Sequence, residues 1–322
     1  MPEFVPRRFL RGGHVQTIAS FLLPRRLSLP PNEERLIEVD PGVKVLCHCH
    51  WQPDRRNALT VIVVHGLEGS SDSGYMLGLA AKGAAMGMNV VRFNQRNCGG
   101  TDALSPTLYH SGRSADIAQV AQHFVERDHI SRLALAGFSM GGNLVLKLAG
   151  EWGNQGPPQF RAVAAVCPAL DLAASADALH LFSNRLYEFY FLRKLRRRLF
   201  TKARLFPGRF DPTRAQGVKS LRDFDDRITA YYSGFAGASD YYARAAAANV
   251  VERIAVPALI LHAANDPFIR IQPETRQKIQ SNPNITFHET EDGGHCSFLA
   301  AAHDGDDGRW AETQVLDFLR KF

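Results

Sequence analysis

Short apolar segments alternate with longer amphipathic segments along most of the chain. The apolar segments are residues 59–66, 88–94, 131–138, 161–170, 257–266 and, last, 285–290. Apolar residues recur every three or four positions, as on one face of a helix, in segments 75–87, 114–128, 140–153 and 310–322. Strands that are apolar on both faces are typical of a parallel sheet between two helical layers, so the pattern predicts an α/β fold.

A different pattern precedes the first of these strands. Residues 36–40 and 43–51 are rich in β-forming residues and flank Pro41-Gly42, which predicts a β-hairpin. We expect residues 1–35 to pack on the core as an N-terminal segment. The α/β core would then comprise residues 36–170 and 251–322.

One connection, residues 171–250, is much longer than the single helix and short loops that usually join parallel strands. We interpret it as a helical cap over the carboxyl ends of the strands, where open α/β sheets bind their ligands. Its aromatic residues could form an apolar cover over a ligand bound there. Its basic cluster, Arg193–Arg198, is either the solvated face of a cap helix or a contact with an anionic membrane surface.

Composition excludes several other classes of protein. The chain is 45% hydrophobic and 22% charged, as globular proteins are, and its net charge of +6 is accompanied by no nucleic-acid-binding motif. Its five cysteines are odd in number, and no secretory signal precedes them, which favours a reducing compartment and a cytoplasmic protein. Arg, His and Pro interrupt the apolar residues of the first segment, so we expect no membrane span.

The chemistry centres on Ser139, in the sequence Gly-Phe-Ser-Met-Gly between an apolar strand and a helix. This Gly-x-Ser-x-Gly pattern is typical of a nucleophile elbow, a sharp turn that exposes the serine hydroxyl at a helix N-terminus. Gly137 and Gly141 provide the small neighbours that such a turn needs. The sequence therefore predicts Ser139 as a nucleophile for acyl transfer.

A serine nucleophile needs a histidine base and a carboxylate that orients it. After such an elbow the acid and then the histidine follow along the chain, each in a loop at a strand's carboxyl end. Asp266 follows the strand 257–266, and His295 lies in a glycine-rich loop after the strand 285–290. We take them as the acid and the base, and interpret Glu291 and Asp292 as solvated loop charges.

Two backbone N–H groups should stabilise the oxyanion. The residue after the nucleophile, Met140, supplies one, and the loop after the strand that ends at His65 supplies the other. Within that loop we predict Leu67 as the donor, because Gly66 lets the backbone bend toward the serine. His65 precedes the nucleophile, so we expect it to shape the loop and not to act as the base.

The motifs HGLEGSSDSGY, GFSMGGN, NDPF and GGHCSF, together with the early GGHVQT, resemble the YheT-like α/β-hydrolases, which are related to the ABHD1- and ABHD3-type hydrolases. The resemblance covers roughly residues 8–320. It implies a mostly parallel eight-stranded sheet with a cap, esterase or lipase-like chemistry, and a triad of Ser139, Asp266 and His295. The chain departs from the family pattern at Asn97, because it reads Arg-Asn-Cys where such relatives tend to carry Arg-Gly-Cys. The roles of His14 and Gln16 stay open.

Other candidate groups receive weaker support. The alternation of Cys47, His48, Cys49 and His50 is typical of an ordinary strand and lacks a third metal ligand. His123 and Asp128 have the spacing of an acyltransferase box but fall on a predicted surface helix. A nucleophilic role for Cys98, Cys167 or Cys296 would need a separate base.

The sequence thus predicts a serine esterase that forms an acyl-enzyme on medium-chain or lipid-like esters, with no cofactor and no metal. The aromatic residues of the cap could cover the acyl chain, which predicts a preference for C6 to C10 esters over acetate. Two alternatives remain. The same triad could pass the acyl group to an alcohol, as an acyltransferase, or the fold could serve a non-catalytic lipid-binding protein.

Overall fold

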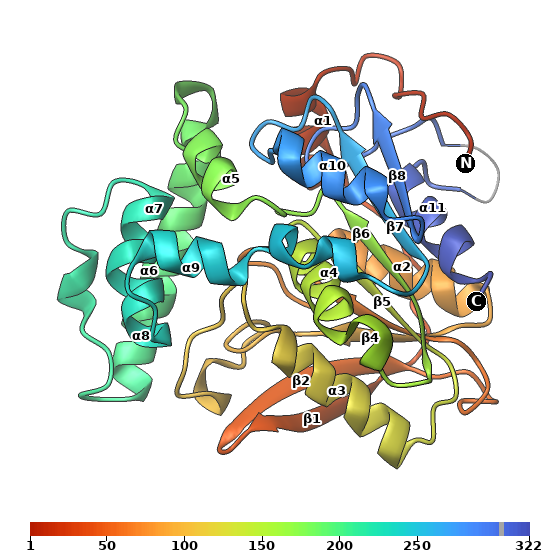
Figure 1. Cartoon of the computed structure of the whole chain (residues 1–322), viewed down its shortest axis with the longest axis horizontal. Helices are drawn as coiled ribbons and strands as arrows, with labels where there is room; N and C mark the ends of the chain where they lie inside the picture. The colour runs from red at the N-terminus through yellow and green to blue at the C-terminus, as the bar shows by residue number, and fades with distance from the viewer. Residues whose placement is uncertain (303–305) are drawn as a thin grey trace.

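Eight strands form one sheet with helices on both faces (Figure 1). The computed structural model describes residues 1–302 and 306–322. The strands are β1 (Glu33–Asp40), β2 (Val43–His50), β3 (Thr60–Val64), β4 (Asn89–Phe93), β5 (Leu133–Phe138), β6 (Phe160–Val166), β7 (Ala258–Ala263) and β8 (Ile285–Thr290). Their order is β1-β2-β4-β3-β5-β6-β7-β8, with β2 antiparallel to β1 and β4 and all other neighbours parallel. This confirms the predicted fold class.

The helices form two layers because the central strands are apolar on both faces; every residue of β3, β5 and β7 is buried. One layer comprises α3 (Ser114–Arg127), α4 (Met140–Trp152) and α10 (Pro273–Ser281). The opposite layer comprises α2 (Gly74–Ala85) and α11 (Trp310–Leu319). Within residues 1–302 and 306–322, every helix falls short of the length or the apolar composition that a bilayer crossing requires.

Several elements differ from the sequence expectations. The apolar segments 161–170 and 257–266 are strands only in part. The first leaves the sheet at Cys167, whose φ is +43°, and the second turns away after Ala263. Those ends form loops, which brings Asp266 beside the top of the sheet. The N-terminal segment contains a helix, α1 (Gly13–Leu22), and α10 fills the crossover between β7 and β8; the pattern of apolar residues had indicated neither helix.

The inserted segment forms a group of helices set apart from the sheet, at the left of Figure 1. They are α5 (Leu172–Leu179), α6 (Arg185–Leu205), α7 (Leu221–Phe224), α8 (Tyr231–Ser233) and α9 (Ala238–Ala245), and we call them the cap. Its largest member, α6, carries the basic cluster. The cap has a small apolar core of its own around Leu192, Leu195 and Leu199.

Part of the basic cluster points inward and joins the cap to the core. Arg198 donates from Nε and Nη2 to the two carboxylate oxygens of Glu68, at 2.8 and 3.0 Å, and from Nη1 to Asp102 at 3.1 Å. Lys194 donates to the carbonyl of Glu68 at 3.1 Å. Arg197, by contrast, is exposed. The cluster is therefore not uniformly a solvated face, because Arg198, whose side chain is only 14% exposed, pairs with a buried carboxylate.

This contrast predicts different effects of two neighbouring substitutions. Arg198→Gln should lower the free energy of unfolding by about 3 kcal/mol, because it leaves the buried Glu68 carboxylate without its cation. Arg197→Gln is the matched control and should stay within about 0.5 kcal/mol of the parent protein. Urea unfolding measures both; equal effects of the two substitutions would contradict the inward role of Arg198.

Candidate active site

The turn between β5 and α4 holds Ser139 in a conformation that few side chains tolerate. Its φ is +55° and its ψ is −119°, and its N–H donates to the carbonyl of Val166 at 2.9 Å. A Cβ on Gly137 would lie 2.3 Å from the carbonyl oxygen of Gly141, and a Cβ on Gly141 would lie 2.2 Å from that of Val64. The glycines are thus required because strand and helix backbones meet here, and the serine begins the helix.

Asp266 and His295 lie together at the ends of neighbouring strands. His295 Nδ1 and Asp266 Oδ2 are 2.8 Å apart, and the Asp266 side chain is fully buried. The other carboxylate oxygen accepts the N–H groups of Phe268 and Ile269, at 3.0 and 2.9 Å. Burial favours the neutral acid, but the charge and hydrogen bond of His295 outweigh it and lower the pKa of Asp266. The arrangement fixes the ring so that Nε2 is the free nitrogen.

The free nitrogen of His295 faces a cysteine. Cys296 Sγ lies 3.9 Å from His295 Nε2, and in the described part of the chain no hydrogen bond joins Nε2 to Ser139 Oγ. The same sulfur also contacts the carbonyl of Val166, at 3.4 Å, which is the carbonyl that accepts the Ser139 N–H. Burial alone would lower the pKa of His295. The charges and hydrogen bonds of Cys296 and Asp266 outweigh burial and raise this pKa above its ordinary value. The base loop is thus adjacent to the serine turn.

The N-terminal helix α1 holds the base loop in place. The N–H of His295 donates to Thr17 Oγ1 at 2.8 Å, and that hydroxyl donates to the carbonyl of Gly13 at 2.6 Å. Buried Gln16 pairs its amide with both backbone groups of Leu299, just after the loop. These contacts assign the early GGHVQT motif a structural role, which sequence reasoning had left open. The only sign of these contacts in the sequence was the GGHVQT motif itself, which contains both Gln16 and Thr17.

The loop that carries His295 also packs closely against the residues next to Asp266. A Cβ on Gly294 would lie 2.5 Å from the carbonyl oxygen of Gly13, so helix and loop touch through backbone. Asn265 accepts the Gly294 N–H at 3.1 Å and donates to Asp292 at 2.8 Å. Asp292 also accepts the Gly12 N–H at 3.0 Å. Asp292 is therefore a structural loop residue, more engaged than the solvated charge expected for it.

The predicted oxyanion donors border the same cavity as the serine. Leu67 and Met140 both line it with Ser139. A Cβ on Gly66 would lie 3.1 Å from Ser139 Cβ, and the Gly66 N–H donates to the Tyr75 hydroxyl at 2.9 Å. Within residues 1–302 and 306–322, neither the Leu67 nor the Met140 N–H donates to a protein acceptor. Both amides are thus available to a ligand.

His65 shapes this loop, as the sequence suggested. Its Nδ1 lies 2.8 Å from the carbonyl oxygen of Gly66, and its Nε2 accepts the Gln95 N–H at 3.2 Å. Burial lowers the pKa of His65 to about 4, so the ring is neutral near pH 7.

The cavity above Ser139 is mostly apolar and is roofed by the cap. Its apolar lining includes Leu172, Ala176, Leu179, Phe191, Leu195 and Phe268. Asp225 and Tyr242 add polar groups, and the two are hydrogen-bonded at 2.8 Å. Of the cap aromatics expected to cover an acyl chain, Phe191 lines the cavity, whereas Phe182 and Phe189 are exposed. Aliphatic side chains of α5 and α6 supply the cover instead.

The remaining candidates have structural partners. Asn97 adopts a φ of +66° and donates to the carbonyl of Thr107, so its loop is held at a left-handed turn. His50 accepts from Arg92, and Asp128 accepts from Arg35 and Arg55. His14 lies 3.1 Å from the hydroxyl of Tyr187 on the cap, next to the cavity wall.

Comparison with known proteins gives consistent results. Residues 60–302 match the family described as alpha/beta hydrolase fold. The chain is 30% identical to "Putative esterase YheT" of Escherichia coli (strain K12), over 99% of this chain and 94% of that one. It is 27% identical to "Medium-chain fatty acid ethyl ester synthase/esterase 2" of Saccharomyces cerevisiae, over 81% and 62%. The structure of the Pyrococcus furiosus esterase Pf2001 superposes with a TM-score of 0.58 at 15% identity, over 93% of this chain and 98% of that one.

The solved structure has the same fold, and the two relatives have similar sequences along most of this chain. With its family match over residues 60–302 and its 30% identity to the Escherichia coli relative, the chain belongs to the α/β-hydrolase family, in its YheT-like branch.

Proposed function

We propose that the protein hydrolyses carboxylic esters through an acyl-enzyme on Ser139, with Asp266 and His295 completing the triad. The observation that carries the proposal is the Asp266–His295 hydrogen bond of 2.8 Å beside a serine at a strand-to-helix turn. The two loops meet at the Val166 carbonyl, which contacts both the Ser139 N–H and Cys296 Sγ. Hydrogen bonds between base and nucleophile are often loose before substrate binds, and we propose that Nε2 turns from Cys296 to Ser139 in the substrate complex.

The reaction would proceed in two halves. His295 Nε2 takes the Ser139 proton as Oγ attacks the ester carbonyl, while Asp266 stabilises the imidazolium that forms. The N–H groups of Leu67 and Met140 receive the negative charge on the carbonyl oxygen, assisted by the N-terminus of α4. His295 then protonates the leaving alcohol, and a water molecule repeats the sequence to release the acid and restore the serine.

The cavity supports an acyl chain of medium length. Its apolar lining would bury methylene groups, each of which contributes about 0.8 kcal/mol, while its polar groups Asp225 and Tyr242 are hydrogen-bonded to each other. The name of the yeast relative mentions medium-chain fatty acid ethyl esters, which agrees with this chemistry. We therefore assign the site to medium-chain or lipid-like esters.

An exposed apolar surface beside the cavity supports a lipid-like source for the substrate. Phe21 and Leu22 of α1 and Leu186 and Phe189 of α6 are all exposed, and Phe21 packs against Tyr190 with ring centroids 6.2 Å apart. Exposed Arg197 lies on the same helix α6. We propose that this surface makes peripheral contact with anionic membranes.

Acyl transfer to an alcohol is the second candidate function. The yeast relative's name includes both synthase and esterase, and the apolar cap could limit the access of water to the acyl-enzyme. Running the ester assays with and without ethanol separates the two outcomes. Hydrolysis yields free acid in both conditions, whereas transfer yields the ethyl ester as the main product when ethanol is present.

Labelling with a fluorophosphonate tests the nucleophile. The probe should modify wild type at Ser139, and Ser139→Ala should abolish both labelling and esterase activity. Ser111→Ala is the matched control, because Ser111 lines the same cavity but lies outside the strand-to-helix turn, and the substitution keeps the Ser111 carbonyl that accepts the Asn143 amide; labelling should persist there. Persistent labelling of Ser139→Ala, or a modified peptide without Ser139, would contradict the assignment.

The hydroxyl of Thr17 should act as a positioning group for the base. Thr17→Val removes the acceptor of the His295 N–H and should lower kcat about 10-fold with little change in KM, since the substrate cavity is untouched. Thr17→Ser keeps the hydroxyl and should restore kcat. A loss in Thr17→Ser equal to that in Thr17→Val would indicate a packing role for the methyl group instead.

The cap cavity should set chain length. Ala176→Phe places a ring in the cavity and should remove the preference of the parent protein for C8 over C2 p-nitrophenyl esters, measured as kcat/KM. Ala173→Phe, on the exposed face of the same helix, is the control and should keep the preference. C8 and C2 acyl groups differ by six methylene groups, so up to about 5 kcal/mol of selectivity is at stake before desolvation and ordering costs. A parent protein that favours acetate would contradict the assignment of this cavity.

A further inference from the structure

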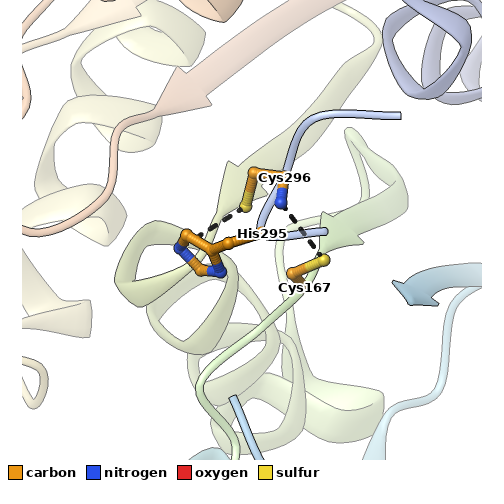
Figure 2. A group of neighbouring side chains, drawn as sticks. All are labelled: Cys167, His295 and Cys296. Carbon is orange, nitrogen blue, oxygen red and sulfur yellow. Dashed lines mark hydrogen bonds between the residues drawn. The ribbon is translucent and has the colours of Figure 1, made fainter. Parts of the chain in front are cut away.

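Three soft donor groups gather next to the proposed base. They are Cys167, His295 and Cys296 (Figure 2), whose ligand atoms all lie within 4.8 Å of one another. Cys296 Sγ is 3.9 Å from His295 Nε2, and the Cys296 N–H donates to Cys167 Sγ at 3.4 Å. Cys167 comes directly after β6 and His295 and Cys296 follow β8, so two separate loops supply the donors.

The backbone fixes this meeting of loops. Cys167 and Cys296 both adopt positive φ angles, +43° and +58°, which turn each residue out of the extended path of its chain. Cys167 Sγ also contacts the carbonyl of Gly294, at 3.6 Å, just before the base. The thiols therefore face each other and the imidazole because of the shape of both loops, and the acyl-transfer steps use neither sulfur.

Two thiolates and one imidazole are the donor set that binds Zn²⁺ and similar soft divalent cations. With Zn–S bonds of about 2.3 Å and Zn–N bonds of about 2.0 Å, ligand atoms of a tetrahedral site lie roughly 3.5 Å apart. The separations here are 3.9 Å for one pair and below 4.8 Å for all, so small side-chain rotations would complete the set.

The surroundings of His295 also match those of a metal-bound histidine. Such a ring donates its other N–H to a carboxylate, which fixes the tautomer and directs the free nitrogen to the ion. Asp266 Oδ2 is the acceptor here, at 2.8 Å from His295 Nδ1. The His295 side chain is 13% exposed and Cys296 is only partly buried, so solvent reaches both residues and an ion can approach these donors.

We propose that Cys167, Cys296 and His295 Nε2 form a binding site for Zn²⁺ or a similar soft divalent cation, and that its occupancy reversibly inhibits the enzyme. On binding, each thiol releases its proton to solvent and the ion gains two thiolate ligands, with no change in oxidation state. Nε2 cannot accept the Ser139 proton while it is bound to the ion. The inhibition rests on the proposed function, whereas the binding does not.

A neighbouring set of donors offers an alternative. Cys167, His262 and Asp266 also have ligand atoms within 4.8 Å of one another, and all three are buried. Among the described residues His262 Nδ1 has no hydrogen-bond partner. Binding there would draw Asp266 away from His295, and it would depend on His262 in place of Cys296. The two sites can thus be separated by substitution.

Cd²⁺ is the probe for binding, because its thiolate bonds absorb in the ultraviolet whether or not the protein is active. Wild type should bind one equivalent of Cd²⁺, seen as ultraviolet absorption of its thiolate bonds, and added Zn²⁺ should displace the Cd²⁺ and remove that absorption. Cys296→Ala should weaken binding at least about 100-fold, since loss of even an outer-sphere partner costs 10- to 100-fold. Cys296→Ser serves as a second variant if Cys296→Ala fails to fold. Cys49→Ala, a buried thiol on β2 outside the cluster, is the control and should bind as wild type does.

Inhibition is measured separately, as the Zn²⁺ concentration that halves each variant's own esterase rate. Wild type and Cys49→Ala should lose activity in Zn²⁺ and regain it with a chelator, and Cys296→Ala should resist. Wild type without the thiolate absorption, or a Cys296→Ala variant that binds as wild type does, would overturn the site. Weakened binding in His262→Gln but not in Cys296→Ala would overturn it in favour of the neighbouring set. A protein that binds Cd²⁺ at Cys296 but has no esterase activity would instead contradict the proposed function alone.

Discussion

The contact between backbones around Ser139 is the constraint on which the site depends. β5 must pass into α4 through one residue with a φ of +55°, and the carbonyls of Val64 and Gly141 lie where the Cβ atoms of larger residues would be. The turn can exist only because glycines occupy those positions. It leaves the first N–H of α4 free for a ligand, so a single packing constraint positions both the proposed nucleophile and one proposed oxyanion donor.

The loops around that turn are held by segments remote in sequence. Thr17 and Gln16 on the N-terminal helix bind the loop of His295, and Arg198 on the cap binds Glu68 next to Leu67. The proposed base, His295, is thus positioned by the N-terminal helix, and the loop of the proposed oxyanion donor Leu67 is positioned by the cap. Because Arg198 belongs to the same helix α6 that roofs the cavity, its ion pair with Glu68 links the cap directly to the loop that contains Leu67.

Local sequence signals predicted most of the sheet and the glycine-rich turn at Ser139, because each depends on neighbours within a few residues. They also placed Asp266 and His295 in loops after strands, and the structure brings these two side chains together. They did not predict what tertiary packing decides. Arg198 resembles its neighbour Arg197 in sequence, and only the position of α6 against Glu68 separates a buried ion pair from a solvated charge. The partners of Gln16 lie at Leu299, and Cys167 meets Cys296 across two loops, so no spacing along the chain could reveal either contact.

Mass spectrometry of the intact protein, acid-quenched during turnover of p-nitrophenyl octanoate, tests the central claim most directly. An acyl-enzyme on Ser139 predicts a species heavier by one octanoyl group, with the added mass on the peptide that contains Ser139, and its absence from Ser139→Ala. Octanoyl carried by Cys296, or rapid turnover in Ser139→Ala, would contradict the claim.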